Sequence, residues 1–331
     1  MSVLRSLIPV LCFFSLFSCQ STAKKTVEPQ PSNLEVPAFS GDSAWQYVKE
    51  QTLFGPRVPN TAAHKACREY LVNTLTTFGA AVTTQTASLT AFDGTTLQAT
   101  NIIGSFLPDK TSRILLCAHW DSRPWADYDP DPANHKKPVM GANDGASGVG
   151  VLLEIARVLG QALADQQPTV GVDIVLFDAE DYGTPTWYEG VHTESSWGLG
   201  SQYWAKTAKA NGYTAKFGIL LDMVGDTNPL FLWEQYSLQF AQSVVGKVWS
   251  TAASLGYNNL FQPRRGGAVT DDHLFVYRLT GIPCINIIDY DPTRIHGFVD
   301  YWHTLYDTLD KIDPRTLEAV GATVLHVIYA E

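Results

Sequence analysis

The sequence predicts a single α/β domain in which a mixed, mostly parallel central sheet is flanked by helices. Short, continuous apolar runs alternate with stretches of helical periodicity, as expected for buried parallel strands joined by helices. Each run also ends in polar side chains, and in such sheets the carboxyl ends of the strands are where sites form. The apolar runs are residues 114–118, 174–177, 219–221 and 284–288.

The remaining elements follow from local patterns. Residues 44–51 and 61–78 have helical spacing, and the second pattern stops at Gly79. Residues 81–106 alternate and are rich in Thr and Val, which is typical of strands. We expect further helices between the apolar runs, at residues 148–159, 198–210 and 237–255.

The composition limits the class of protein. The chain has 331 residues, 45% of them hydrophobic and 17% charged, which predicts a sizeable core and excludes disorder or a coiled coil. Lys and Arg number 23 against 33 for Asp and Glu, giving a net charge of −10. Because an acidic chain without a basic run binds phosphate backbones poorly, we expect no nucleic-acid partner.

The N-terminal residues predict export. Residues 1–19 read as a signal peptide, with Arg5 before an apolar stretch that is too short to span a bilayer. The stretch ends in a lipobox-like sequence with Cys19 as the residue to be lipidated, and residues 20–38 read as a flexible tether. We therefore expect a periplasmic or cell-envelope protein anchored by lipid to a bacterial membrane; ordinary secretion with cleavage nearby is the alternative.

The cysteines that remain after the signal do not form a disulfide framework. Cys67, Cys117 and Cys284 are odd in number, and each lies in an apolar context. The pattern predicts three buried thiols.

Acidic and imidazole side chains at the predicted strand ends indicate a metal site. Glu180 and Asp181 are adjacent carboxylates at the end of a buried strand, where their repulsion is costly without a cation. Asp222 and His119 end two other strands, while Asp144 lies on a glycine turn that opens a helix and could by itself be an N-cap. Carboxylates together with imidazoles are typical zinc ligands.

Other chemistries lack their sequence signatures. The strand ends carry no Gly-rich phosphate loop, no dinucleotide-binding fingerprint and no Gly-x-Ser-x-Gly elbow. Phosphoryl transfer, nicotinamide chemistry and serine hydrolysis are therefore not indicated.

The ordered set of these residues, completed by a late His303, resembles the ligand set of zinc-dependent aminopeptidases with an α/β fold. Within that superfamily the sequence is most similar to the glutaminyl-peptide cyclotransferases, or glutaminyl cyclases. The similarity rests on residues 117–123, 271–275 and 302–304 and covers roughly residues 40–330. It identifies residues 39–331 as a single catalytic domain.

The resemblance implies one zinc ion per chain and cyclisation of the N-terminal glutamine of peptides or proteins to pyroglutamate, with release of ammonia. It implies Asp144, Asp181 and His303 as zinc ligands. Glu180 would be the proton shuttle, with Asp222 and Asp271 in an acidic hydrogen-bond chain behind it. The pocket for the glutaminyl side chain would be lined by Trp187, Phe298 and Trp302. We expect a monomer whose only membrane contact is the N-terminal lipid.

Departures from the family leave several assignments open. Animal members have Glu where this chain has Asp181, which is one methylene shorter, and a histidine where it has Asn286. Trp197 competes with Trp187 for the pocket position, and Asp271 could merely cap the helix that contains Phe275.

Two other functions remain to be weighed. A two-zinc exported aminopeptidase would use His119 and Asp222 for a second metal and Glu180 to activate water. A non-catalytic binding protein on the same fold is the third possibility.

Overall fold

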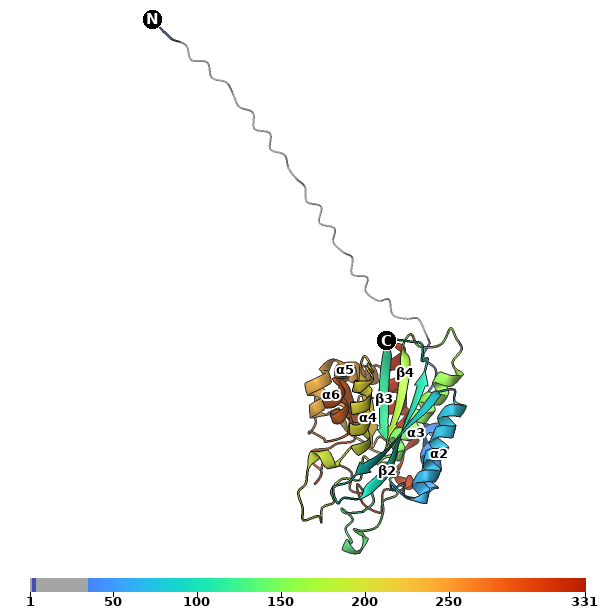
Figure 1. Ribbon diagram of the computed structural model, residues 1–331. Helices are drawn as coiled ribbons and strands as arrows, with labels where there is room; N and C mark the ends of the chain where they lie inside the picture. The colour runs from blue at the N-terminus through green and yellow to red at the C-terminus, as the bar shows by residue number, and fades with distance from the viewer. Residues whose placement is uncertain (1, 4–34) are drawn as a thin grey trace. The chain divides into compact units, whose positions relative to one another are not determined.

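A six-stranded sheet in the order β1-β2-β4-β3-β5-β8 forms the centre of the fold (Figure 1). β3, β4, β5 and β8 are mutually parallel, whereas β2 pairs antiparallel with both β1 and β4. The strands are β1 (Ala81–Thr90), β2 (Thr96–Phe106), β3 (Arg113–His119), β4 (Gly171–Phe177), β5 (Gly218–Asp222) and β8 (Cys284–Ile288). The predicted mixed, mostly parallel sheet is confirmed.

The structure, a computed structural model, describes residues 2–3 and 35–331. The described residues from Glu35 onward belong to one compact unit. Cys19, nearly all of the predicted signal peptide and most of the predicted tether lie outside the described residues. Among the residues that are described, no helix combines the length and the apolar character needed to cross a membrane.

Helices cover both faces of the sheet, and the alternation of side chains along β3 shows how. Ile114, Leu116 and Ala118 belong to a large core with helices on one face, whereas Leu115 and Cys117 belong to a smaller core on the other. The larger core takes in α1 (Gly41–Thr52), α2 (Ala62–Thr77), α3 (Ala146–Gln161), α5 (Gln235–Ser254) and α7 (Pro314–Tyr329). The smaller one takes in α4 (Leu199–Ala210) and α6 (Asp272–Thr280), which Figure 1 shows across the sheet from α2 and α3.

The helices expected from the sequence are present, but one was missed. α7 was not predicted, although Asp313 caps it by accepting from Arg315 N and Pro314 opens its first turn. The short parallel pair β6 (Phe231–Trp233) and β7 (Phe261–Arg265) was not predicted either. The 3₁₀ turns are η1 (Pro132–Asn134), η2 (Glu194–Ser196) and η3 (Leu309–Lys311).

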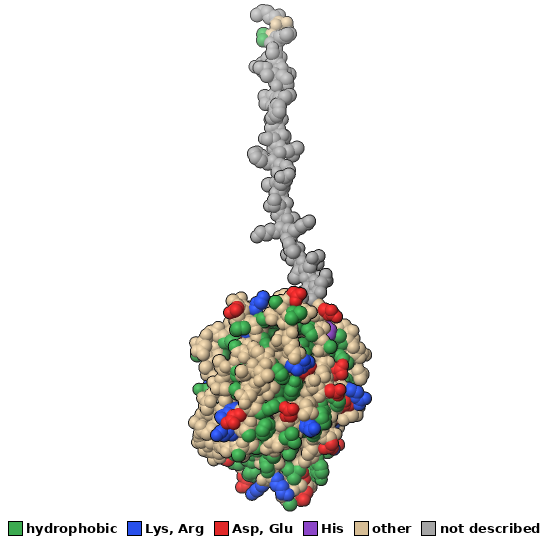
Figure 2. Space-filling model, turned by 90° about the vertical axis from the view of Figure 1, so that its right-hand side faces the viewer, with side chains coloured by type: hydrophobic (Ala, Val, Ile, Leu, Met, Phe, Trp, Pro, Cys, Tyr) green, Lys and Arg blue, Asp and Glu red, His purple; other side chains and the backbone are tan. Residues whose placement is uncertain are grey.

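The predicted buried thiols are present, and one face of the molecule carries mixed charge (Figure 2). Cys67, Cys117 and Cys284 are free and buried, as predicted. On the face in Figure 2, Lys and Arg side chains are interspersed with Asp and Glu rather than gathered in one patch.

The carboxyl ends of the parallel strands place polar residues at one edge of the sheet. β3 ends at His119, β4 ends directly before Asp178, and β5 ends at Asp222. Because these strands are parallel neighbours, their ends converge, and the candidate site is built there.

Candidate active site

Three buried side chains from separate parts of the chain form a cluster with the composition of a metal site. Asp144, Asp181 and His303 each offer one ligand atom, and these atoms all lie within 4.8 Å of one another. His303 Nε2 lies 3.5 Å from Asp144 Oδ2 and 3.4 Å from Asp181 Oδ1. The structure thus brings together the three residues expected as zinc ligands, even with the shorter Asp181.

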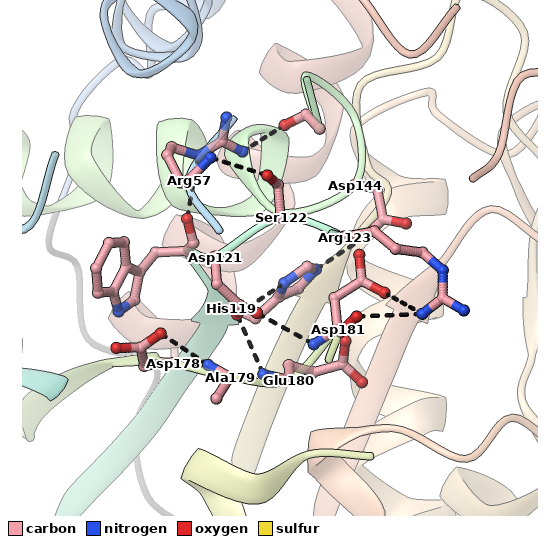
Figure 3. Close-up of polar contacts among 12 residues, drawn as sticks. Arg57, His119, Asp121, Ser122, Arg123, Asp144, Asp178, Ala179, Glu180 and Asp181 are labelled. Atoms are coloured by element: carbon pink, nitrogen blue, oxygen red, sulfur yellow. Dashed lines mark hydrogen bonds and ion pairs between the residues drawn. The ribbon is translucent and has the colours of Figure 1, made fainter. Parts of the chain in front are cut away.

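A strained turn after β4 aims Glu180 and Asp181. Ala179 has φ of +53°, a left-handed conformation that is unfavourable for a residue with a Cβ. The two carboxylate oxygens of Asp121 accept hydrogen bonds from Glu180 N (3.1 Å) and Asp181 N (3.2 Å), as Figure 3 shows. Asp178 accepts from Ala179 N at 2.8 Å. These buried acceptors hold the turn in place.

The glycine turn before α3 turns Asp144 into the site. The helix begins after Gly145, which has φ of +98° and provides no side-chain cap. The carboxylate of Asp307 instead accepts from Asn143 N (2.7 Å) and Asp144 N (3.1 Å). This leaves the Asp144 carboxylate free to face His303, so Asp144 is not the N-cap of α3.

A second cluster shares Asp144 with the first. The ligand atoms of His119, Asp144 and Asp222 also lie within 4.8 Å of one another. His119 Nε2 is 3.0 Å from Asp144 Oδ1 and 3.3 Å from Asp222 Oδ1. The arrangement could hold a second cation, so the geometry by itself leaves the two-zinc alternative open.

The electrostatics show that the site needs positive charge. Although burial opposes it, hydrogen bonds to the acids raise the pKa of His119 well above its usual range. Although burial lowers it, the charge of Asp181 and hydrogen bonds to Asp144 and Asp181 raise the pKa of His303. The two imidazoles in turn lower the pKa of Asp144. These shifts have one physical cause, the concentration of buried carboxylates, which favours positive charge at this place.

Glu180 points into the site without a hydrogen-bond partner for its carboxylate among the described side chains. Burial, together with the charges of Asp271, Asp272 and Asp181, raises its pKa well above the usual range. Burial and the charge of Asp271 likewise raise the pKa of Asp222 to about 7. A carboxyl group with a raised pKa is suited to accept and return a proton near neutral pH.

Asp271 caps the helix that contains Phe275, which is one of the two roles that the sequence left open, whereas the acidic hydrogen-bond chain behind Glu180 stays a prediction. It is the N-cap of α6, accepting from Asp272 N at 2.5 Å, and it also lines the cavity beside Glu180. Its other carboxylate oxygen accepts from Asn286 Nδ2 at 2.6 Å.

A cavity of about 270 Å³ opens beside these acids. Its size suits a single side chain better than a large ligand. Phe298 and Trp302, two of the three aromatic residues expected in the pocket, line it. The ring of Trp302 stacks on the ring of His303, with centroids 3.7 Å apart. The walls of the cavity also include Trp197, Met223, Ile288, Tyr290 and His296.

The third expected aromatic residue, Trp187, does not line this cavity. It is 41% exposed and packs edge-on against Trp125, at 5.8 Å between centroids. Trp197 takes the pocket position, with its ring nearly parallel to that of His303 at 6.1 Å. A hydrogen bond between the hydroxyl groups of Thr184 and Ser196, at 2.9 Å, joins the two ends of the loop that contains Trp187, directly before Trp197.

Glycine at position 183 makes room for Trp197. A Cβ on Gly183 would lie 2.1 Å from the Trp197 ring. The sequence left Trp197 only as an alternative to Trp187, and Gly183 is the residue that could have indicated the choice.

The residues of the first cluster fit a zinc ion. Two carboxylates and one imidazole form a donor set that zinc accepts, with positions left open for catalysis. Asp181 Oδ2 is buried and has no hydrogen-bond partner among the described groups, which is costly for a carboxylate unless a cation is bound.

The fold and the site together define a zinc-peptidase-like protein, with acidic and imidazole ligands at the carboxyl ends of a mostly parallel sheet. Residues 101–328 match the model of peptidase family M28, and the chain belongs to that family.

Solved structures of bacterial proteins resemble the chain over most of its length. A Bacteroides thetaiotaomicron glutaminyl cyclase bound to N-acetylhistamine is 56% identical, with a TM-score of 0.87, and covers 90% of this chain and 100% of its own. A Tannerella forsythia glutaminyl cyclase is 52% identical, with a TM-score of 0.86, over 89% and 100% of the two chains. A Zn-dependent exopeptidase from Parabacteroides distasonis is 55% identical, with a TM-score of 0.87, over 90% and 100%.

Curated relatives are more distant and longer. Aminopeptidase YwaD of Bacillus subtilis is 27% identical over 265 residues, which are 76% of this chain and 49% of that protein. The chain therefore spans about half the length of this relative.

Proposed function

We propose that the protein converts the N-terminal glutamine of peptides and proteins to pyroglutamate and releases ammonia. The observation that carries this proposal is a cavity with aromatic walls that is large enough for one side chain. Glu180 points into it beside the cluster of Asp144, Asp181 and His303. The 56% identity to a glutaminyl cyclase supports it.

The reaction needs no external nucleophile. The α-amine of the glutamine forms a bond to the carbonyl carbon of its own side-chain amide, and the bond from that carbon to the amide nitrogen breaks to release ammonia. Glu180 accepts the proton that the amine loses and returns it to the departing nitrogen. Asp144, Asp181 and His303 would hold a zinc ion, which when bound would supply Lewis-acid activation of the amide carbonyl.

The aromatic walls supply orientation. Trp197 and Trp302 lie against the His303 ring at the edge of the cavity, where they exclude water and hold the glutaminyl side chain in one pose. Because the ring closes within one molecule, holding the amine near the amide contributes a large share of the rate. The amine must be neutral to attack, so activity should rise with pH through about 7.7–8.0.

A two-zinc aminopeptidase is the alternative that a specific observation favours. The cluster of His119, Asp144 and Asp222 offers a second cation site, and similar proteins include a named exopeptidase. We propose one zinc ion per chain, and the two functions predict different products. The third possibility, a non-catalytic binding protein, receives no support because the full set of ligands converges.

Two peptides distinguish the enzymes. A Gln-initiated and a Leu-initiated peptide are incubated with the protein, and ammonia and free amino acid are measured separately. Ammonia from the first peptide alone, with about one zinc ion per active chain, supports the cyclase. Free leucine, with two tightly bound zinc ions per chain, would show that the protein is an aminopeptidase. A heterocyclic chelator should abolish activity in either case.

We further propose that the protein is exported and anchored by lipid at Cys19 to a bacterial membrane, with the catalytic domain acting as a monomer. The apolar run before Cys19 supports the anchor. Expressed with its own signal, the protein should partition with membranes in a lipid-modified form, and Cys19→Ala should block this processing. A soluble mature chain that begins elsewhere would show ordinary secretion.

A further inference from the structure

Arg123 is a buried cation next to the metal-type cluster. It follows β3 by four residues, and only 1% of its side chain is exposed. In Figure 3 its guanidinium points toward Asp181. Burying a charge is costly unless it is fully paired, so the contacts of this group indicate what it stabilises.

The first contact is with the ligand Asp181. Arg123 Nη1 donates to Asp181 Oδ1 at 3.2 Å and to the main-chain oxygen of the same residue at 3.1 Å. One nitrogen thus fixes both the backbone and the side chain of Asp181. The other oxygen, Oδ2, has no partner among the described groups and stays available to a cation.

The second contact leads to the ligand His303. Arg123 Nε and Nη2 donate to the two oxygens of Asp127, at 2.7 and 2.9 Å, in a bidentate pair. Asp127 Oδ1 lies 3.7 Å from His303 Nδ1, a distance for electrostatic attraction but not for a hydrogen bond. The hydrogen bond comes from the next residue, Tyr128, which donates its N–H to the main-chain oxygen of His303 at 3.2 Å. His303 itself has φ of +55°, so this strained residue depends on its surroundings.

Two indole rings complete the environment of the guanidinium. The Arg123 Cζ lies 4.8 Å from the Trp197 ring centroid and 5.9 Å from that of Trp125. These distances are within the range of cation–π interactions. Since Trp197 is a wall of the cavity, the same side chain supports the pocket as well as the ligands.

We infer that Arg123 is a positioning residue for the metal site. It holds Asp181 directly, and by anchoring Asp127 it fixes the adjacent backbone of Tyr128, which binds His303. The inference rests on the proposed zinc site but not on the cyclisation reaction. A planar guanidinium can make both sets of contacts at once, whereas the ammonium of lysine is a point charge that cannot reproduce the bidentate pair with Asp127. Groups that orient metal ligands typically change metal affinity 10- to 100-fold when they are altered.

The test compares two Arg→Lys variants for zinc affinity, measured by competition with a chromophoric chelator in the absence of substrate. Arg123→Lys should raise the zinc Kd by about 10- to 100-fold. Arg113→Lys is the matched control, because Arg113 makes a similar bidentate pair with Asp173, with both distances 2.6 Å, at the opposite end of β3. Its zinc Kd should not change.

An Arg123→Lys protein that is folded and binds zinc within about twofold of the parent overturns the inference. So does an equal loss of zinc affinity in Arg113→Lys, because the loss would then reflect lower stability in general.

If Arg123→Lys fails to fold, Asp127→Asn tests the same chain of contacts. This change keeps the shape but weakens the bidentate pair, so the zinc Kd should still rise several-fold, and an unchanged Kd contradicts the inference. In the zinc-saturated protein, either variant should lower kcat more than it raises KM. If the parent protein binds zinc but has no cyclase activity, and the variants still bind zinc more weakly than the parent, only the proposed function is refuted.

Discussion

Replacing Glu180 by Gln separates the proton shuttle from the neighbouring ligand. The substitution conserves the volume of the side chain and breaks no hydrogen bond to its carboxylate among the described residues. It also removes a carboxyl group whose pKa is raised by burial and by the nearby acids, so the folded state should be no less stable than the parent.

The expected kinetic effect is large and confined to turnover. A positioned general acid–base group is worth about 10²- to 10⁴-fold in rate, or about 3–5 kcal/mol of transition-state stabilisation. Because Glu180 is not among the proposed ligands Asp144, Asp181 and His303, zinc content should stay at the parent level in Glu180→Gln. KM should change little, since the aromatic walls are untouched.

The assay follows ammonia release from a Gln-initiated peptide, with zinc content and thermal unfolding measured on the same preparation. Glu69→Gln, at an exposed position on α2, is the matched control and should behave as the parent does. A Glu180→Gln protein that loses its zinc, or one that binds zinc and turns over near the parent rate, would refute the assignment of Glu180 as shuttle and Asp181 as ligand.

Three further outcomes are expected. Asp181→Ala should lower zinc content and activity together, as measured by metal analysis, whereas a variant that retains zinc would contradict its role as a ligand. Trp197→Ala should raise KM about tenfold through the lost stacking surface, while Trp187→Ala should stay within about twofold of the parent. Burial raises the pKa values of Asp222 and Asp307 to about 7, so the folded metal-free protein holds protons that the unfolded chain has released. Its melting temperature should therefore fall as pH rises from about 5 to 8, and saturating zinc should flatten that slope.

The position of the acids at the sheet edge could be predicted because it depends on topology rather than on details of packing. Parallel strands that read as apolar runs must place their carboxyl ends at a common edge, and His119 and Asp222 end two of those strands. Glu180 and Asp181 follow a third strand after a short turn, so little chain separates them from that edge.

Single motifs did not reveal the neighbours of the ligands. Arg123 stands in the sequence four residues before Asp127, but nothing in that spacing shows that the pair also reaches Asp181 and His303. These contacts join segments 58 or more residues apart in the chain.

The sequence by itself predicted the strands of the central sheet and the acidic and imidazole side chains at their carboxyl ends, because these depend on residue type and periodicity, which are local properties. The family, and the choice of Asp144, Asp181 and His303 as ligands, followed from the resemblance of the ordered motifs to glutaminyl cyclases. Only the tertiary structure decided that Trp197 rather than Trp187 lines the cavity. The path of a long loop depends on contacts between residues that are apart in the chain, here the hydrogen bond between Thr184 and Ser196 and the space that Gly183 leaves for the Trp197 ring. The tertiary structure likewise decided that Asp144 faces His303 instead of capping α3, because the distant carboxylate of Asp307 binds the backbone of that turn.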